Sequence, residues 1–298
     1  MTPRAPRSVH QFGGDWTARK LHAVQRYLNA YTTALRRQPF TLLYVDAFAG
    51  TPFHETSPLA EIVEPLFPGF DADEPTRLLE GSARRALQVE PPFDRYLFFE
   101  KHRVRCAQLE QLRADFPALA DRIVIERREA NDAIRTLCAG GWAGRRATMF
   151  LDPYGMQVEW ATIEAIAATR AVDLWVLFPL GIAVNRLITR SGEIPPPWRH
   201  RLDLMLGSEE WYQAFYEIVP EPTLFGDDRA RVVKASQEVI GGYFTRRLRG
   251  IFSGVADRPA ILQNSRGMPL YLLCFAVGNP RGTETALRIA NHILREAT

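Results

Sequence analysis

The sequence has few cysteines and no long apolar run. Its three cysteines, Cys106, Cys138 and Cys274, lie far apart, and none forms a Cys-x-x-Cys pair. This spacing indicates neither a disulfide framework nor a zinc knuckle, and it favours a reducing compartment. No stretch approaches the roughly 18 apolar residues that a membrane span needs. The first residues carry charge but no apolar core of a signal peptide. We therefore expect a cytoplasmic protein.

Several motifs for phosphate binding and nucleophilic catalysis are also missing. The sequence contains no P-loop and no G-x-S-x-G nucleophile elbow. The G-x-G-x-x-G turn, on which a dinucleotide pyrophosphate rests, is absent after the first expected strand, where residues 46–52 read DAFAGTP. His102 and Cys106 lie one helical turn apart without a third ligand nearby in sequence, so no metal site is predicted. These absences argue against a nicotinamide cofactor and a serine hydrolase.

The chain carries a pattern of alternating strands and helices. It has 298 residues, 46% of them hydrophobic, which is enough for a buried core. Its 37 basic and 34 acidic residues give a net charge of +3, which permits contact with nucleic acid without requiring it. Short apolar runs predict strands at 42–46, 96–99, 123–125, 148–151, 172–178, 261–263 and 270–277. Apolar spacings of three and four predict helices at 16–35, 83–89, 104–116, 131–137, 160–168, 209–218, 232–248 and 283–295.

This alternation predicts an α/β fold, a Rossmann-like, doubly wound and mostly parallel sheet with a helical insertion after the fifth strand. We expect an N-terminal arm and helix at 1–38, a cofactor-binding core at 39–178 and a helical insertion or cap at 179–258. Residues 259–298 would supply the strands and helix that complete the core. The stretch 52–80 is rich in proline and acids and predicts a long loop over the carboxyl edge of the sheet.

Polar residues follow the first four expected strands. They are Asp46, Glu100, the pair Asn131 and Asp132, and Asp152. Because the carboxyl ends of parallel strands meet at one edge of a sheet, these side chains are expected in one crevice. A carboxylate after the second strand can accept hydrogen bonds from both hydroxyls of a ribose. An acidic, glycine-poor first turn suits a cofactor without phosphates, such as S-adenosylmethionine, better than a dinucleotide.

Five motifs resemble a known family. GGDWTARKLHAVQRYLNAY, YVDAFAGTP, EGSARRAL, YLFFEKH and MFLDPYG are similar to those of the bacterial three-Cys-motif partner proteins, which are related to class I methyltransferases. The likeness covers about residues 12–186. It implies a separate partner that carries the three-cysteine motif and an iron–sulfur cluster. It also implies S-adenosylmethionine contacts through Asp46, Phe48, Ala49 and Gly50, ribose contact by Glu100, and adenine contact near Asn131 and Asp132.

The opening helix is similar to that of a ribosomal RNA adenine methyltransferase family in which a lysine reaches the cofactor carboxylate. That likeness places Lys20 in this role. The stretch Asp152-Pro153-Tyr154-Gly155 resembles the D-P-P-Y motif of amine methyltransferases. By that likeness the Asp152 side chain and the Pro153 carbonyl accept the hydrogens of the acceptor amine, while Tyr154 stacks on the base. Two residues depart from the patterns, because Tyr154 comes one position early and Pro52 stands where the family usually has glycine.

The sequence thus predicts an S-adenosylmethionine-dependent methyltransferase for an amine nitrogen of a nucleic acid, nucleoside or related small molecule. Arg186, on the helix expected after the fifth strand, is a candidate for binding an acidic group of the substrate. The alternative is a non-catalytic or cofactor-binding partner of an iron–sulfur enzyme, and an NAD(P)-dependent oxidoreductase is a third possibility.

Overall fold

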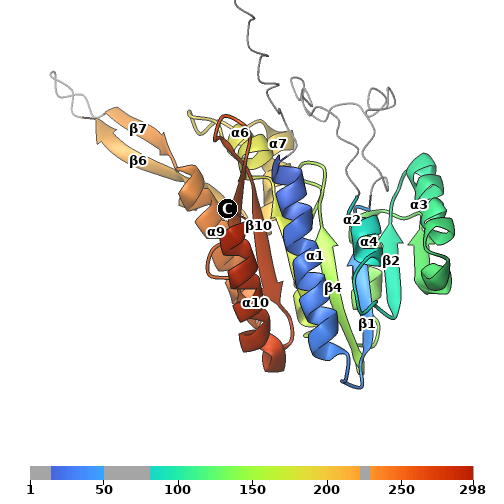
Figure 1. Cartoon of the computed structure of the whole chain (residues 1–298). Helices are drawn as coiled ribbons and strands as arrows, with labels where there is room; N and C mark the ends of the chain where they lie inside the picture. Colours follow the sequence, from blue (N-terminus) through green and yellow to red (C-terminus); the bar gives the residue numbers. More distant parts are fainter. Residues whose placement is uncertain (1–14, 50–80, 222–228, 298) are drawn as a thin grey trace, which may run out of the picture.

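A mostly parallel β-sheet forms the centre of the molecule (Figure 1). The computed structural model describes residues 15–49, 81–221 and 229–297. The main sheet has eight strands in the order β3-β2-β1-β4-β5-β10-β8, with β9 also paired to β10. Its strands are β1 (Thr41–Asp46), β2 (Arg95–Phe99), β3 (Ile123–Glu126), β4 (Arg145–Leu151), β5 (Val172–Phe178), β8 (Gly254–Val255), β9 (Ala260–Gln263) and β10 (Pro269–Val277).

The strand order reverses between β1 and β4. β1 pairs in parallel with both β2 and β4, and β4 pairs in parallel with β5, whereas β10 runs antiparallel to β5 and β8. Strands β1 and β4 are almost wholly buried because helices cover both faces of the sheet. The predicted Rossmann-like, doubly wound fold is confirmed. The carboxyl ends of β1 and β4 flank the switch point, where ligands bind in such sheets.

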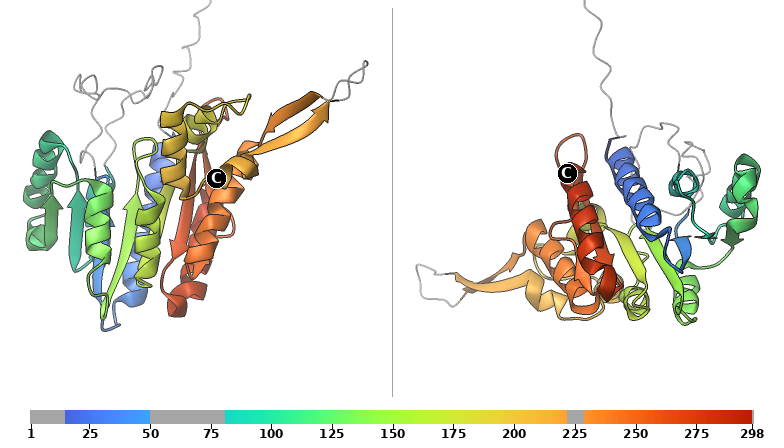
Figure 2. Two further views of the ribbon diagram at one scale, coloured as in Figure 1. Left: turned by 180° about the vertical axis from the view of Figure 1, so that it is seen from behind. Right: turned by 60° about the horizontal axis from the view of Figure 1, so that its bottom comes forward.

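Helices cover both faces of the sheet, as the front and back views show (Figures 1 and 2). Their buried side chains belong to two apolar clusters, one on each face. On one face lie α1 (Asp15–Leu35), α2 (Ser82–Leu87), α3 (Arg103–Asp115) and α10 (Thr283–Glu296); on the other lie α4 (Ala130–Cys138), α5 (Trp160–Ala168), α7 (Pro196–Leu206), α8 (Trp211–Phe215) and α9 (Gln237–Ile251). Within the described residues, every helix is too short or too polar to cross a membrane.

A buried carboxylate fixes α1 to the sheet. The hydroxyl of Tyr27 in α1 donates to Asp173 in β5 at 2.7 Å, and the backbone N–H of Gly278, after β10, donates to the other oxygen at 3.3 Å. Burial raises the pKa of Asp173 to about 6, although both hydrogen bonds oppose the rise. This anchor joins three elements and fixes α1 across the sheet, so that the first turns of the helix lie at the carboxyl edge.

The segment after β5 differs from the prediction. A π-helical turn (Leu180–Val184) leads into α6 (Asn185–Leu187), and the helix expected at 209–218 ends at Phe215. A two-stranded hairpin follows, β6 (Tyr216–Glu221) and β7 (Arg229–Lys234), which projects from the body (Figure 2). The helix expected at 232–248 begins only at Gln237. Both strands of a ribbon are edges, so Pro220 is tolerated in β6.

Candidate functional site

One lysine of α1 reaches the switch point of the sheet. The ammonium group of Lys20 lies 2.5 Å from the carboxylate of Asp152, which directly follows β4. Trp16, one turn earlier on the same helix face, lies with its ring 5.1 Å from the Lys20 ammonium and stacks on Tyr271 of β10 at 4.9 Å. Lys20 is only 4% exposed. Its charge therefore faces the crevice and not the solvent.

A second carboxylate, Asp46, ends β1 and is completely buried. It accepts hydrogen bonds from the Phe48 N–H at 3.3 Å and the Tyr44 hydroxyl at 3.4 Å. Burial raises its pKa to about 7; a hydrogen bond with the Ser82 side chain opposes this rise, and the charge of Asp152 adds to it. Asp46 thus exchanges its proton near neutral pH, and a cation placed beside it would favour the ionised form.

Glu100 follows β2 and is also buried, 6% exposed. One oxygen accepts a hydrogen bond from the His102 N–H at 2.9 Å, and the other lies 3.8 Å from the Arg105 guanidinium. A carboxylate offers about four lone-pair positions, so Glu100 retains capacity for further donors. The turn after β1 lies next to Glu100, because the Ala49 N–H donates to the Phe99 carbonyl at 3.4 Å.

Small residues form the part of this turn that the structure describes. Ala47 and Ala49 are buried, and Phe48 is half-buried against the core. Gly50 and Pro52, the other residues singled out in the turn, lie outside the described residues.

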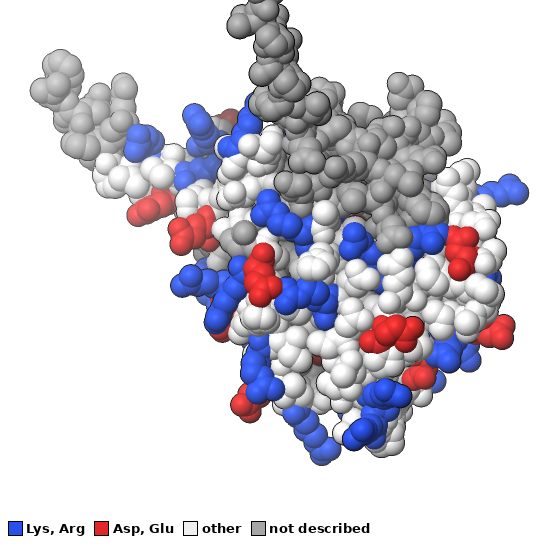
Figure 3. Space-filling model, viewed as in Figure 1, with Lys and Arg blue, Asp and Glu red and all other residues white. Residues whose placement is uncertain are grey.

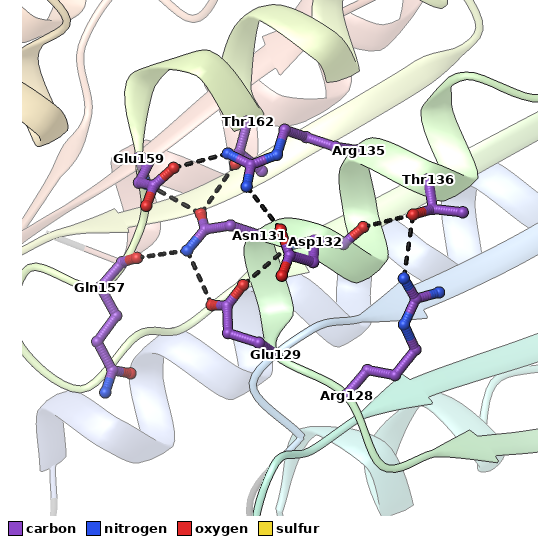
Figure 4. Close-up of polar contacts among 9 residues, drawn as sticks. All are labelled: Arg128, Glu129, Asn131, Asp132, Arg135, Thr136, Gln157, Glu159 and Thr162. Carbon is purple, nitrogen blue, oxygen red and sulfur yellow. Dashed lines mark hydrogen bonds and ion pairs between the residues drawn. The ribbon is translucent and has the colours of Figure 1, made fainter.

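The side chain of Asn131 is fully used inside the protein (Figure 4). Its amide nitrogen donates to Glu129 and to the Gln157 carbonyl, both at 2.9 Å. Its oxygen accepts from the Glu159 N–H at 3.0 Å and the Thr162 hydroxyl at 2.8 Å. These four bonds exhaust the capacity of an amide. An adenine contact by this side chain would therefore require the loss of an internal bond.

Asp132 lies on the exposed surface of α4. Its carboxylate is 65% exposed and pairs with Arg135 at 2.7 Å, which in turn contacts Glu159 at 2.6 Å (Figure 4). The side chain thus belongs to a surface ion-pair network. The structure brings Lys20, Asp46 and Asp152 together and places Glu100 at the end of the next strand, whereas the contacts of Asn131 and Asp132 are made within the protein.

The stretch after β4 leaves the sheet in a tight turn. Pro153 is buried, while Tyr154 is 46% exposed and Gly155 has a φ of 67°, a conformation that favours glycine. Burial of part of its ring raises the pKa of Tyr154. An aromatic ring is thus presented at the surface two residues after Asp152.

Two residues at the site were not predicted from the sequence. Gly81 is the N-cap residue of α2, and the side chain of Ser82 makes a hydrogen bond with Asp46. Glu129 caps α4 by accepting from the Asp132 N–H at 2.9 Å. An acid directly before a predicted helix is a signal for such a cap. Among the residues that the structure describes, no three His, Cys, Asp or Glu side chains are placed to hold a metal ion.

No protein-family model matches the sequence, and no curated protein matches it. Solved structures with a similar arrangement include protein LPL1258 from Legionella pneumophila, of family model DUF519, at 14% identity and a TM-score of 0.49, covering 96% of this chain and 93% of that one. Magnesium protoporphyrin IX methyltransferase from Synechocystis, solved with bound SAH, is 11% identical with a TM-score of 0.39; the coverage is 92% and 90%. Cofactor-bound Rv0187 from MTB is 12% identical with a TM-score of 0.39, covering 94% and 100%. All three TM-scores lie below 0.5.

Proposed function

We propose that the protein is an S-adenosylmethionine-dependent methyltransferase that acts on an amine nitrogen of a nucleic acid, nucleoside or related small molecule. The observation that carries this proposal is the position of Asp152. It follows β4 at the switch point of the sheet, electrostatically coupled to Asp46 and ion-paired with Lys20. An acid at this place, followed by a buried proline and an exposed aromatic ring, suits the recognition of an amine beside a cofactor.

The charges of the crevice fit the cofactor. Three carboxylates, Asp46, Glu100 and Asp152, lie at the carboxyl ends of neighbouring strands, and Asp152 pairs with the buried Lys20. S-adenosylmethionine has a sulfonium and an ammonium group but no phosphates, and when bound it supplies an electrophilic methyl group. Glu100 has the free acceptor capacity for two ribose hydroxyls, and Asp46 would ionise beside positive charge. Lys20 is the cation available for the methionine carboxylate.

The pairing of Lys20 with Asp152 gives these two residues linked roles. Asp152 and the Pro153 carbonyl would accept the two hydrogens of the acceptor amine and hold its lone pair in line for transfer. As the N–CH3 bond forms, the S–CH3 bond of the sulfonium would break and leave S-adenosylhomocysteine, and Asp152 would then accept the proton that the nitrogen loses. In the structure Asp152 is paired with Lys20. Binding of a carboxylate-bearing cofactor next to Lys20 would draw the ammonium away and release Asp152 for the amine, which favours binding of the cofactor before the acceptor.

The same ion pair supports a second role. If Asp152 stays paired with Lys20 when the cofactor is bound, Asp152 cannot receive an amine. The protein would then bind the cofactor without methylating anything. It would then serve as the partner of an iron–sulfur protein of the three-Cys-motif kind.

Calorimetric titrations with S-adenosylmethionine, S-adenosylhomocysteine and NAD separate these roles. We expect both sulfur ligands to bind and NAD not to bind. Transfer of a labelled methyl group is then assayed on RNA, DNA and nucleosides. Failure of both sulfur ligands to bind would reject the methyltransferase. Tight binding of the sulfur ligands, with no methyl transfer by the wild-type protein to any of these acceptors, would favour the partner role, and binding of NAD alone would favour an oxidoreductase.

A further inference from the structure

Three cationic residues lie near the root of the β6–β7 hairpin, two of them in the segment after β5 and one at the end of β7. Arg186 belongs to α6 and Arg190 to the loop after it, and both are exposed. Lys234 ends β7 and donates to the Asn185 carbonyl at 2.5 Å, which places it next to Arg186. Burial and the charge of Arg190 hold the pKa of Lys234 below its usual value. Lys234 and Arg190 thus interact electrostatically, and Arg186 directly follows the residue that Lys234 contacts. These three cationic residues are here called the hairpin-root cluster.

The cluster has no carboxylate partner within the described part of the chain. Other arginines of the same half of the chain do have structural roles. Arg199 pairs with Glu209 and lies over the Tyr212 ring at 4.9 Å, and Arg247 lies over the Trp160 ring at 4.5 Å. Like charges held together without a counter-ion repel each other, and a bound anion would remove that repulsion.

The backbone that carries the cluster is held in place. The Tyr216 hydroxyl donates to the Thr189 carbonyl at 2.8 Å, and the Tyr212 hydroxyl donates to the Gly192 carbonyl at 2.9 Å. A Cβ on Gly192 would lie 3.3 Å from Val232 of β7, so the loop and the hairpin are in close contact. The arginines therefore stand on a fixed frame, which lowers the entropic cost of binding an anion.

The cluster lies on the same edge of the sheet as Asp152. β5 neighbours β4 in the sheet, and α6 follows the carboxyl end of β5 through one π-helical turn. In Figure 1, α6 and the root of the β6–β7 hairpin lie at the top, where the parallel strands end. The space-filling view in Figure 3 shows blue side chains gathered around this root.

We propose that the hairpin-root cluster binds backbone phosphates of a nucleic-acid strand that carries the acceptor amine. The link to the acceptor rests on the proposed function, whereas the binding itself does not. Arg186 and Arg190 can each bind a phosphate through two parallel hydrogen bonds, and Lys234 adds a point charge. Arg186 and Arg190 lie four residues apart on one segment, and Lys234 comes from the end of β7. Two guanidinium groups, each able to hold one phosphate, fit successive phosphates of a strand better than one small anion.

The test is fluorescence anisotropy of labelled single-stranded RNA and DNA oligonucleotides of one sequence, without cofactor, at about 50 to 200 mM salt. In the wild-type protein we expect log K to fall linearly with log salt. In the double variant Arg186→Gln/Arg190→Gln, two phosphates are no longer neutralised. The slope of log K against log salt should therefore become shallower by about 1.4, at about 0.7 for each phosphate, and the affinity at low salt should fall about tenfold. This variant keeps the bond from Lys234 to Asn185, so the hairpin root stays intact, and an unchanged melting temperature checks this.

A matched control removes the same number of charges at the opposite edge. Arg36 precedes β1 and Arg145 begins β4; both are exposed. We expect Arg36→Gln/Arg145→Gln to bind within about twofold of the wild type. An equal loss in both variants would overturn the proposed site, because net charge alone would then explain binding. Binding of neither RNA nor DNA would also overturn it. Calorimetry with S-adenosylmethionine is independent of all these outcomes.

Discussion

The ammonium group of Lys20 lies 2.5 Å from the carboxylate of Asp152, although 132 positions of the chain separate them. The Lys20 side chain is 5% exposed and that of Asp152 is 24% exposed. In so dry a place an ion pair is costly to break from one side, since the remaining charge is left without a partner. The pair therefore determines how much negative charge the crevice presents to a cofactor and to an amine.

Lys20→Met should weaken S-adenosylmethionine binding about tenfold or more, because the cofactor carboxylate loses its buried cation. It should also lower the melting temperature, since Asp152 is left beside Asp46 without a neutralising charge. Calorimetry and thermal unfolding measure the two effects. Arg19→Met is the control, because Arg19 is exposed on the same helix. Unchanged cofactor affinity in Lys20→Met would mean that Lys20 serves Asp152 alone.

Asp152→Asn should reduce methyl transfer at least about 100-fold, which corresponds to about 2.7 kcal/mol, because an amide has only one oxygen to accept hydrogens and no negative charge. Cofactor affinity should not fall, because Lys20 no longer has to leave an ion pair to meet the cofactor carboxylate. Single-turnover transfer and calorimetry on the same preparation separate chemistry from binding. A variant that transfers at the wild-type rate would show that another group receives the amine.

Glu100→Ala should weaken binding of S-adenosylmethionine by about 1 to 3 kcal/mol, the cost of losing charged hydrogen bonds to the ribose. Glu110→Ala is the matched control, because Glu110 lies exposed on α3 and pairs with Arg113 at the surface. Calorimetry with adenosine gives a second readout, since the same loss is expected without the methionine part. Equal affinities in the two variants would place the ribose elsewhere.

Much of the fold is encoded in local patterns. The strands from β1 to β5 are short apolar runs, and polar residues end or follow the first four of them. The stripe from Leu21 to Leu35 marks α1, so both kinds of element were predicted within a few residues. The positions of Asp46, Glu100 and Asp152 at strand ends follow from the same patterns. Their use as binding and catalytic residues stays a prediction.

The remaining features depend on contacts that no local pattern specifies. The apolar residues Val232 and Val233 made the helix α9 look longer than it is, although they belong to β7. The true start of α9 is marked by Ser236, whose side chain accepts a hydrogen bond from the Val239 N–H at 3.3 Å. Asn131 resembles a ligand contact because it follows a strand, yet its four partners come from Glu129 and from residues 157–162. Only the folded arrangement of α4 and α5 brings these groups together.

Asn131→Ala should therefore lower the free energy of unfolding by about 2 to 4 kcal/mol, because the buried partners of the amide lose their hydrogen bonds. Cofactor affinity of the folded protein should change less than about threefold. Urea unfolding and calorimetry test this pair of expectations, with Asp132→Ala as the exposed neighbour. A large loss of affinity without loss of stability would restore Asn131 as a direct adenine ligand.

Asp46 and Asp173 should make the protein more stable in mild acid. Their folded pKa values of about 7 and about 6 lie above the value near 3.9 of an unfolded aspartate. As pH falls from about 7 to about 4, the folded state binds protons that the unfolded state does not, so the free energy of unfolding contributed by these groups rises.

Urea unfolding from pH 8 to pH 4 measures the slope, at about 1.4 kcal/mol per unit of pKa difference. Asp46→Asn should flatten the profile from about pH 7 downward and Asp173→Asn from about pH 6. Asp121→Asn, on the exposed surface, should leave it unchanged. A wild-type profile that keeps its slope in both buried variants would mean that neither carboxylate takes up its proton in this range.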